Sequence, residues 1–301
     1  MCNENINRME TTKNYLGINE QILAEWQEEF KRRGNNPDHF SYDGIMFKGE
    51  IHRECGTDDS NWVRDPSDDN YTVENKLWET APLRILFLSK DQYIDDKAYE
   101  SYILSFRDKT TALEDYRLTS NRFLKRMAYA IYGLSKSTPD EVVPFDYPAE
   151  HEEEVLRWID DFPFAWINCK KEGGGSTCSY SALVAAMNDY KDFLVKQIQN
   201  VDADIIVCCG YSENLSQSGQ STGYPILDFL KENVYDFEYA GNEYQDVWFD
   251  KKSGKLAIGS WHPSAWGKDI TNESFYYYIV NTYQKFIHDN PSFVESHRKG
   301  L

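Results

Sequence analysis

Four short apolar runs, each followed at once by polar residues, constrain the fold of this chain more than any other feature. They span residues 84–88 (RILFL), 164–168 (FAWIN), 205–209 (IIVCC) and 256–260 (LAIGS). Near-continuous apolar runs of this length are typical of strands buried on both faces. Helical patterns separate them, which favours parallel strands covered on both sides. We therefore predict an α/β fold, a three-layer α/β/α arrangement with a central, largely parallel four-stranded sheet.

The segments around these runs carry apolar residues at helical spacing. Helices are predicted over 120–133 and 181–200, and a third opens at Thr271. A helix over 18–33 precedes a polar, turn-rich stretch that ends near residue 80. We therefore expect two parts: an N-terminal helix and irregular arm over 1–80, and an α/β domain over 81–301. A local hairpin is expected just before the last strand, where VWFD is followed by the turn KSG.

The charge of the chain limits the partners that it can bind. Its formal net charge is −18, from 50 acidic and 32 basic residues. DNA attracts proteins chiefly through phosphate neutralisation, so this excess argues against tight, nonspecific binding to long duplexes. Salt screening still allows a basic rim around a local pocket. Nucleic acid or a nucleotide therefore remains a possible partner, and the sequence leaves the oligomeric state open.

Cysteine spacing and hydropathy indicate the compartment. The six cysteines form no C-x-x-C pair, so neither a zinc ribbon nor a clustered iron–sulfur site is indicated. Free thiols in a reducing compartment are the expected state. The N-terminus has no apolar signal core, and the chain contains no apolar run of roughly 18 residues that could span a membrane. We expect a cytoplasmic protein without a membrane segment.

Chemically useful side chains stand at the ends of three predicted strands. Asp91 follows the first run, Asn168 ends the second, and His262 follows the fourth. In open α/β sheets, ligands bind outside the carboxyl ends of the strands. If the sheet is parallel, these three side chains meet at one edge although they are distant in sequence. Each alone also has an ordinary explanation, as a helix cap, a turn residue or a packed corner.

The order and context of these residues resemble uracil-DNA glycosylases. That family carries an apolar strand running into G-Q-D-P-Y, a middle strand ending in Asn, and a late strand running into H-P-S. Here the corresponding segments are LFL-SKDQY, AWIN and SW-HPS, and IIVCCG is similar to the family's apolar strand that ends in Gly. The resemblance covers roughly residues 81 to 290 and leaves the N-terminal arm outside it.

The resemblance implies a role for each matched residue. Asp91 would orient water and stabilise a sugar cation, and His262 would donate a hydrogen bond to the departing base. Asn168 would pair with the edge of a flipped pyrimidine. The catalytic residues are thus expected to be Asp91 and His262. The predicted substrate-binding residues are Asn168, Tyr93, Lys90, Ser264, Phe106 and Trp266.

Departures from the family pattern change the expected chemistry. Lys90 replaces the family's Gln before the aspartate, where it would lower the pKa of Asp91 or bind a phosphate. Phe106 is the nearest aromatic that could stack on a base. Trp266 follows the H-P-S motif, where the family often places an apolar wedge, and it could act as a wedge or a stacking platform.

A glycine-rich loop follows the second strand. Such a loop can form a backbone nest for phosphate, with lysines adding point charges, or it can be an ordinary turn without a ligand. The order G-K-[ST] of a P-loop is absent. The predicted phosphate-binding residues are Lys170, Lys171, Gly173, Gly174, Gly175 and Ser176.

Two functions follow from the sequence. The first is a uracil-DNA-glycosylase-like hydrolase that cleaves the N-glycosidic bond of a flipped, deaminated base, with no cofactor or metal. The alternative is a non-catalytic module that keeps the fold and binds a nucleotide or small ligand. The acidic charge and the altered first motif favour the alternative, while the order of the three motifs favours the enzyme.

Overall fold

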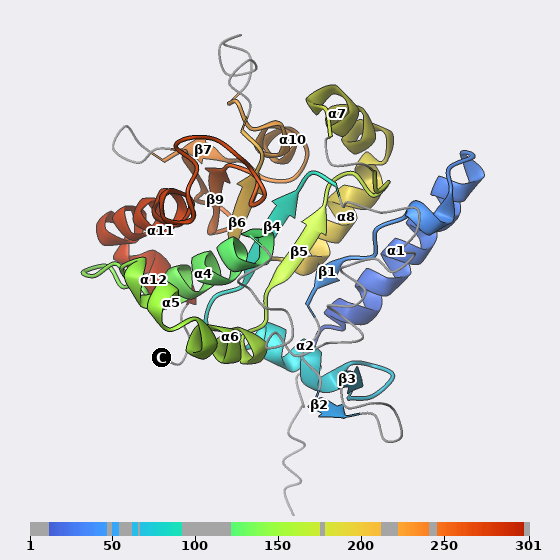
Figure 1. Ribbon diagram of the computed structural model, residues 1–301. Helices are drawn as coiled ribbons and strands as arrows, with labels where there is room; N and C mark the ends of the chain where they lie inside the picture. Colours follow the sequence, from blue (N-terminus) through green and yellow to red (C-terminus); the bar gives the residue numbers. More distant parts are fainter. Residues whose placement is uncertain are drawn as a thin grey trace, which may run out of the picture.

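The computed structural model describes residues 12–46, 50–53, 62–65, 67–91, 122–174, 178–211, 222–240 and 246–297. A twisted sheet lies at the centre, with helices on both of its faces (Figure 1). The fold is therefore mixed α/β, as predicted.

The central sheet has seven strands in the order β1-β5-β4-β6-β9-β8-β7. Their bounds are β1 Gly44–Ile45, β4 Ile85–Ser89, β5 Ala165–Asn168, β6 Ile205–Cys209, β7 Glu238–Tyr239, β8 Val247–Asp250 and β9 Lys255–Ser260. Strand β4 is parallel to β5 and to β6, and β6 is parallel to β9. The four predicted strands are thus confirmed, and they form the adjoining parallel centre of the sheet.

The prediction of a four-stranded sheet is wrong, because three antiparallel strands extend the parallel centre. Strand β1 pairs with β5 at one edge, while β8 pairs with β9 and β7 with β8 at the other. The β8–β9 hairpin was expected, whereas β1 comes from the stretch predicted to be irregular. Apolar runs reveal strands buried on both faces, but a short edge strand such as the exposed β7 has no such run. A separate two-stranded sheet joins β2 Glu50–Arg53 to β3 Trp62–Asp65.

Two layers of helices cover the sheet. On one face lie α4 and α11, and on the other lie α1, α8 and α10 (Figure 1). The helices are α1 Tyr15–Arg32, α2 Thr72–Glu79, α4 Arg122–Lys136, α5 Asp146–Glu150, α6 Glu152–Asp161, α7 Tyr180–Asp189, α8 Lys191–Val201, α10 Pro225–Asn233, α11 Asn272–Asp289 and α12 Pro291–His297, with a 3-10 turn at Pro37–His39. The helix predicted over 181–200 is therefore two helices, and they meet at Tyr190, whose backbone is not helical.

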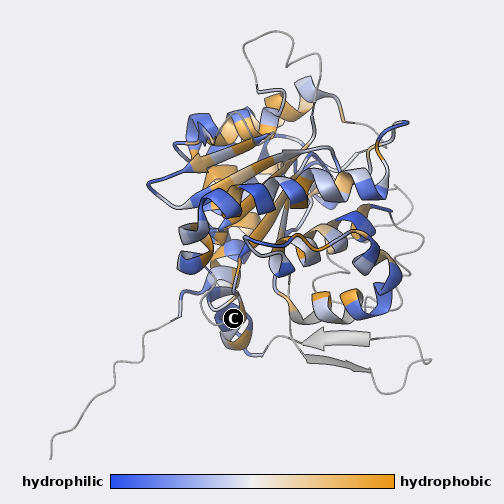
Figure 2. Cartoon of the chain, turned by 90° about the vertical axis from the view of Figure 1, so that its left-hand side faces the viewer, coloured by the Kyte–Doolittle hydropathy of each residue, from blue (hydrophilic) through white to orange (hydrophobic). Residues whose placement is uncertain are grey.

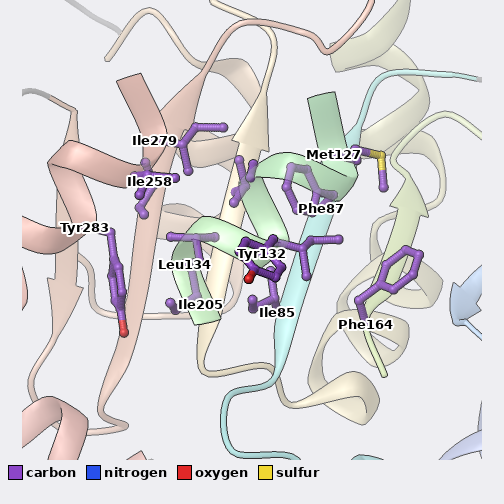
Figure 3. Packing of buried hydrophobic residues seen from close by; sticks show 14 of the residues in the cluster. Ile85, Phe87, Met127, Tyr132, Leu134, Phe164, Ile205, Ile258, Ile279 and Tyr283 are labelled. Carbon is purple, nitrogen blue, oxygen red and sulfur yellow. The ribbon is translucent and has the colours of Figure 1, made fainter. Parts of the chain in front are cut away.

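Alternation along the strands divides the core into two apolar clusters. In β4, Ile85 and Phe87 pack toward α4 and α11, whereas Leu86 and Leu88 pack toward α1 and α8. The strands are largely apolar in Figure 2, and polar colour is concentrated on the helices and loops. Figure 3 shows side chains of the first cluster, which come from the sheet and from α4 and α11. Both faces of the sheet are therefore buried.

The N-terminal helix packs against the same core as the sheet. Trp26 and Phe30 of α1 belong to the second cluster, and α1 lies along α8. The boundary at residue 80 stays a prediction, although α1 and β1 contribute to the same apolar core and sheet as the rest. Of the helices in the described part of the chain, none is long and apolar enough to cross a membrane.

Candidate functional site at the carboxyl ends of the parallel strands

The strand order creates a switch point between β4 and β6. From β4 the chain crosses to β5 on one side, and from β6 it crosses to β9 on the other. Ligands of open α/β sheets bind in the crevice outside the strand ends at such a point. The four arrowheads point to the same edge of the sheet, and α7 lies beyond that edge (Figure 1). The residues that follow β4 and β6 are therefore the first to consider.

The side chain of Lys90, which follows β4, reaches across the switch point to Gly210, which follows β6. Gly210 follows β6 with φ +125°, and a Cβ atom there would lie 2.8 Å from Cε of Lys90. Only glycine fits both the backbone conformation and the close approach. The Lys90 ammonium lies over the ring of Tyr180, 4.0 Å from its centroid, and the Tyr180 hydroxyl donates to the carbonyl of Tyr211. The cation is thus held at the carboxyl ends of β4 and β6 by an aromatic ring.

Asp91 is a largely buried carboxylate beside a second cation. Its side chain is 13% exposed, and Lys170 Nζ lies 3.8 Å from its Oδ2. Burial raises the pKa of Asp91, and it outweighs the lowering by Lys170, by the hydrogen bond from Cys178 and by Lys90. Lys90 acts in the direction expected from the sequence, but the net shift is opposite. The carboxylate is therefore a stronger base than an exposed one.

His262 follows β9 and is held as a neutral donor. The Ser264 backbone N–H donates to Nδ1 at 3.3 Å, and Ser264 Oγ lies 2.7 Å from the same nitrogen. Because a backbone N–H can only donate, Nδ1 accepts and the ring proton is on Nε2. Burial, together with the charge of Lys90, lowers the pKa of His262 to about 4. At neutral pH the imidazole therefore offers an Nε2–H donor.

One aromatic side chain contacts the histidine, and another belongs to the segment that follows it. Phe123, at the start of α4, lies 5.5 Å from the imidazole and 4.6 Å from the Trp166 ring, between centroids. Trp266 is 81% exposed, and the guanidinium of Arg122 stacks on it at 3.7 Å from its centroid. One face of Trp266 is thus covered by a cation, and most of its surface faces solvent.

The side chain of Asn168 is committed to the N-terminal segment. Its Nδ2 lies 3.2 Å from Ser41 Oγ and 3.4 Å from an Asp43 carboxylate oxygen, which also accepts from the Asn168 backbone N–H at 2.9 Å. The residue is fully buried, and within the described residues its Oδ1 has no hydrogen-bond partner. The amide nitrogen is therefore occupied by the N-terminal segment, and the pairing of Asn168 with a base stays a prediction.

The two lysines of the glycine-rich loop have different surroundings. Lys171 is buried and forms an ion pair with Asp43, while Lys170 contacts Asp91 and Glu172. Only Lys170 is therefore placed to meet a ligand. Two glycines of the loop differ as well. Gly173 N–H donates to the His39 carbonyl, whereas a Cβ on Gly174 would lie 3.9 Å from Asp91.

The remaining predicted site residues fall into two groups. Ser264 is exposed and orients His262, as described above. Tyr93, Phe106, Gly175 and Ser176 lie outside the described residues. Sequence reasoning missed Asp43, Cys178 and Tyr180, because no local motif marks them. Among the residues that the structure covers, no cluster of His, Cys, Asp and Glu could hold a metal ion.

Comparisons with known proteins found nothing similar to this chain. No protein-family model, no curated protein and no solved structure matches the chain. The functional argument therefore depends on the residues and their geometry.

Proposed function

We propose that this edge of the sheet binds a nucleotide unit and hydrolyses its N-glycosidic bond, as the resemblance to uracil-DNA glycosylases implies. The observation that carries the proposal is the neutral His262 with its proton on Nε2. It follows β9, while the desolvated carboxylate Asp91 follows β4, and the charge of Lys90 acts on both groups. A donor and a base thus stand at the strand ends on the two sides of β6.

The reaction needs these two groups for different reasons. When the bond between the sugar C1′ and the base nitrogen breaks, its electron pair leaves with the base, and the sugar gains oxocarbenium character. The Nε2–H of His262 stabilises the anionic base by a hydrogen bond. Asp91 orients a water molecule, accepts its proton as oxygen bonds to C1′, and stabilises the cation. Water is the only co-reactant, and the proton lost from it balances the departing anion.

Charge and stacking groups favour a single strand or a free nucleotide as substrate. The net charge of −18 opposes long duplexes, but Lys90 and Lys170 supply local positive charge for a phosphate. The exposed Trp266 offers a stacking surface next to the histidine loop. The substrate class that fits both is an unpaired nucleotide.

The proposal is tested with a single-stranded oligonucleotide that contains one uracil. Incubation is followed by alkaline cleavage at abasic sites, and parallel oligonucleotides carry other deaminated bases. Wild-type protein should yield abasic sites, and Asp91→Asn and His262→Ala should each abolish most of the yield. Asp289→Asn and His288→Ala are matched controls, since both side chains are exposed at the C-terminal end of α11, whereas His262 precedes the start of that helix. Cleavage by the Asp91→Asn/His262→Ala double variant at the wild-type rate would contradict the mechanism.

The alternative is binding of a nucleotide phosphate without turnover. It is favoured by the start of α7 at Tyr180, because a helix N-terminus beside Lys90 and Lys170 is suited to an anion. Thermal shifts with a panel of nucleotides separate the two functions. Stabilisation that is lost in a Lys90→Met/Lys170→Met variant, without abasic sites in the cleavage assay, supports binding. No shift with any nucleotide counts against it.

A further inference from the structure

Arg126 of α4 is a buried cation without an acidic partner among the described residues. The residue is 2% exposed, and no carboxylate in the described part of the chain forms an ion pair with it. Burial lowers the pKa of Arg126 to about 10, so the guanidinium stays charged at neutral pH. A buried charge is costly unless its donors are satisfied, and an apolar residue of similar volume is often no less stable. Its presence therefore calls for a reason other than core stability.

The guanidinium donates all of its assigned hydrogen bonds to one segment. Nη1 donates to the carbonyls of Pro263 and Ala265, at 2.9 and 3.0 Å. Nη2 donates to the carbonyl of Ile270 at 2.8 Å, and Nε donates to Asn272 Oδ1 at 2.9 Å. All four acceptors belong to the connection between β9 and α11 or to the first residue of α11. One planar group thus joins both ends of that connection.

The two carbonyls bound by Nη1 flank the residue that orients the histidine. Ser264 lies between Pro263 and Ala265, and its N–H and hydroxyl contact Nδ1 of His262. The Ala265 N–H also donates to the His262 carbonyl at 2.8 Å, which closes a turn over residues 262–265. Holding the carbonyls on both sides of Ser264 fixes the peptide whose N–H defines the acceptor nitrogen of the ring.

We propose that Arg126 is the positioning residue of the His262 turn, which it holds through backbone carbonyls so that the imidazole keeps its proton on Nε2. Arg126 acts through Ser264 and contacts neither the reacting atoms nor His262 itself. A lysine could satisfy fewer of these acceptors, because it has one nitrogen in place of a planar fork. This role deepens the proposed function, and its activity readout rests on that function.

The direct test is nitrogen NMR of the histidine side chain at neutral pH. In wild-type protein labelled with ¹⁵N-histidine, we expect His262 to show one protonated Nε2 and one unprotonated Nδ1. In Arg126→Met the two nitrogens should move toward averaged positions, and amide hydrogen exchange over 262–270 should become at least about tenfold faster. Arg126→Lys should lie between the two.

A second, partly buried arginine provides the control. Arg84 lies at the opposite end of β4, in ion pairs with Asp202 and Asp204. Arg84→Met should lower the stability of the fold but leave the nitrogen shifts of His262 unchanged. If the shifts and the exchange rates of Arg126→Met and Arg126→Lys both equal those of the wild type, the proposal is wrong. Should Arg126→Met not fold, Arg126→Lys alone decides between these outcomes.

The outcome is independent of whether the protein cleaves nucleotides. If wild-type protein forms no abasic sites, the proposed hydrolysis fails, and the NMR result still decides the role of Arg126. If the wild type does cleave, Arg126→Lys should lower kcat more than it raises KM, since His262 acts on the departing base. A purely structural role would lower the melting temperature without moving the histidine shifts.

Discussion

The two ends of the parallel strands use charge in different ways. At the amino end, Arg84 lies 2.9 Å from Asp202 and 2.8 Å from Asp204, and Lys255 lies 2.7 Å from Asp202. At the carboxyl end, the contact of Asp91 with Lys170 is 3.8 Å long, and Lys90 rests on an aromatic ring. Close ion pairs thus hold the starts of β4, β6 and β9, whereas the contacts of Asp91 and Lys90 after β4 are looser. The buried pair of Lys171 with Asp43, which follows β5, is the exception at the carboxyl end.

Side-chain hydrogen bonding also differs between the two ends of the strands. The buried hydroxyl of Ser260, the last residue of β9, has no hydrogen-bond partner among the described residues. Asp204, at the amino end, has both carboxylate oxygens occupied by Arg84. On the proposed function, the amino end serves stability and the carboxyl end serves catalysis. The predictions below test this contrast from the largest effect to the smallest.

The largest effect is expected from Asp204→Ala at the amino end. It leaves Arg84 and Lys255 without a largely buried partner, which should cost about 3–5 kcal/mol of unfolding free energy. Urea denaturation measures this loss. The cleavage rate of the folded protein should not change, and a loss of activity without a loss of stability would contradict the contrast.

His262→Ala, at the carboxyl end, should lower the cleavage rate strongly and the stability only slightly. Removing one donor to a developing anion costs about 3–4 kcal/mol of transition-state stabilisation, so the cleavage rate should fall roughly 10²–10³-fold. The unfolding free energy should change far less than in Asp204→Ala. Single-turnover cleavage and urea denaturation of the same preparation provide the comparison, with His288→Ala as the control.

Trp266→Ala tests whether a single-stranded substrate stacks on this side chain. Loss of one stacking platform should weaken binding of a single-stranded oligonucleotide by about 1–3 kcal/mol. Because the side chain is 81% exposed, the fold should be little affected. Fluorescence anisotropy with a labelled oligonucleotide measures the affinity, and Tyr239→Ala, an exposed aromatic of β7, is the control. Equal affinities of Trp266→Ala and wild type would exclude the stacking role.

The smallest expected effect is on the pH dependence of folding stability. Its sign should be opposite for Asp202 at the amino end and Asp91 at the carboxyl end. The ion pairs of Asp202 lower its pKa, so its stabilisation is present above the pKa of the unfolded chain and is lost as pH falls through the folded value. Burial raises the pKa of Asp91, so its ionisation disfavours the folded state as pH rises through that pKa. Asp202 is 42% exposed, so Asp202→Asn should lower stability at pH 7 by less than about 1 kcal/mol.

Asp91→Asn should leave the stability at pH 7 unchanged or raise it, because it removes a desolvated charge. Denaturant titrations of both variants at pH 4 and pH 7 give the signs. A marked loss of stability in Asp91→Asn would show that the carboxyl end is held together by its charges as firmly as the amino end.

The sequence by itself determined the four central strands, the β8–β9 hairpin and the cap of α11 at Thr271. These are local properties, because burial on both faces requires a continuous apolar run and a cap requires residues three positions apart. It also placed Asp91 and His262 directly after strands that prove to be parallel. Their position at the same edge of the sheet follows from that topology.

Only the tertiary structure decided what these groups contact. Asp43 lies 125 residues from Asn168, and Arg126 lies 137 residues from Pro263, so no local pattern could reveal either contact. The same holds for the difference between Lys170 and Lys171, which are adjacent in sequence but bind different carboxylates. Partners, protonation and burial depend on which segments pack together, and that is a property of the whole fold.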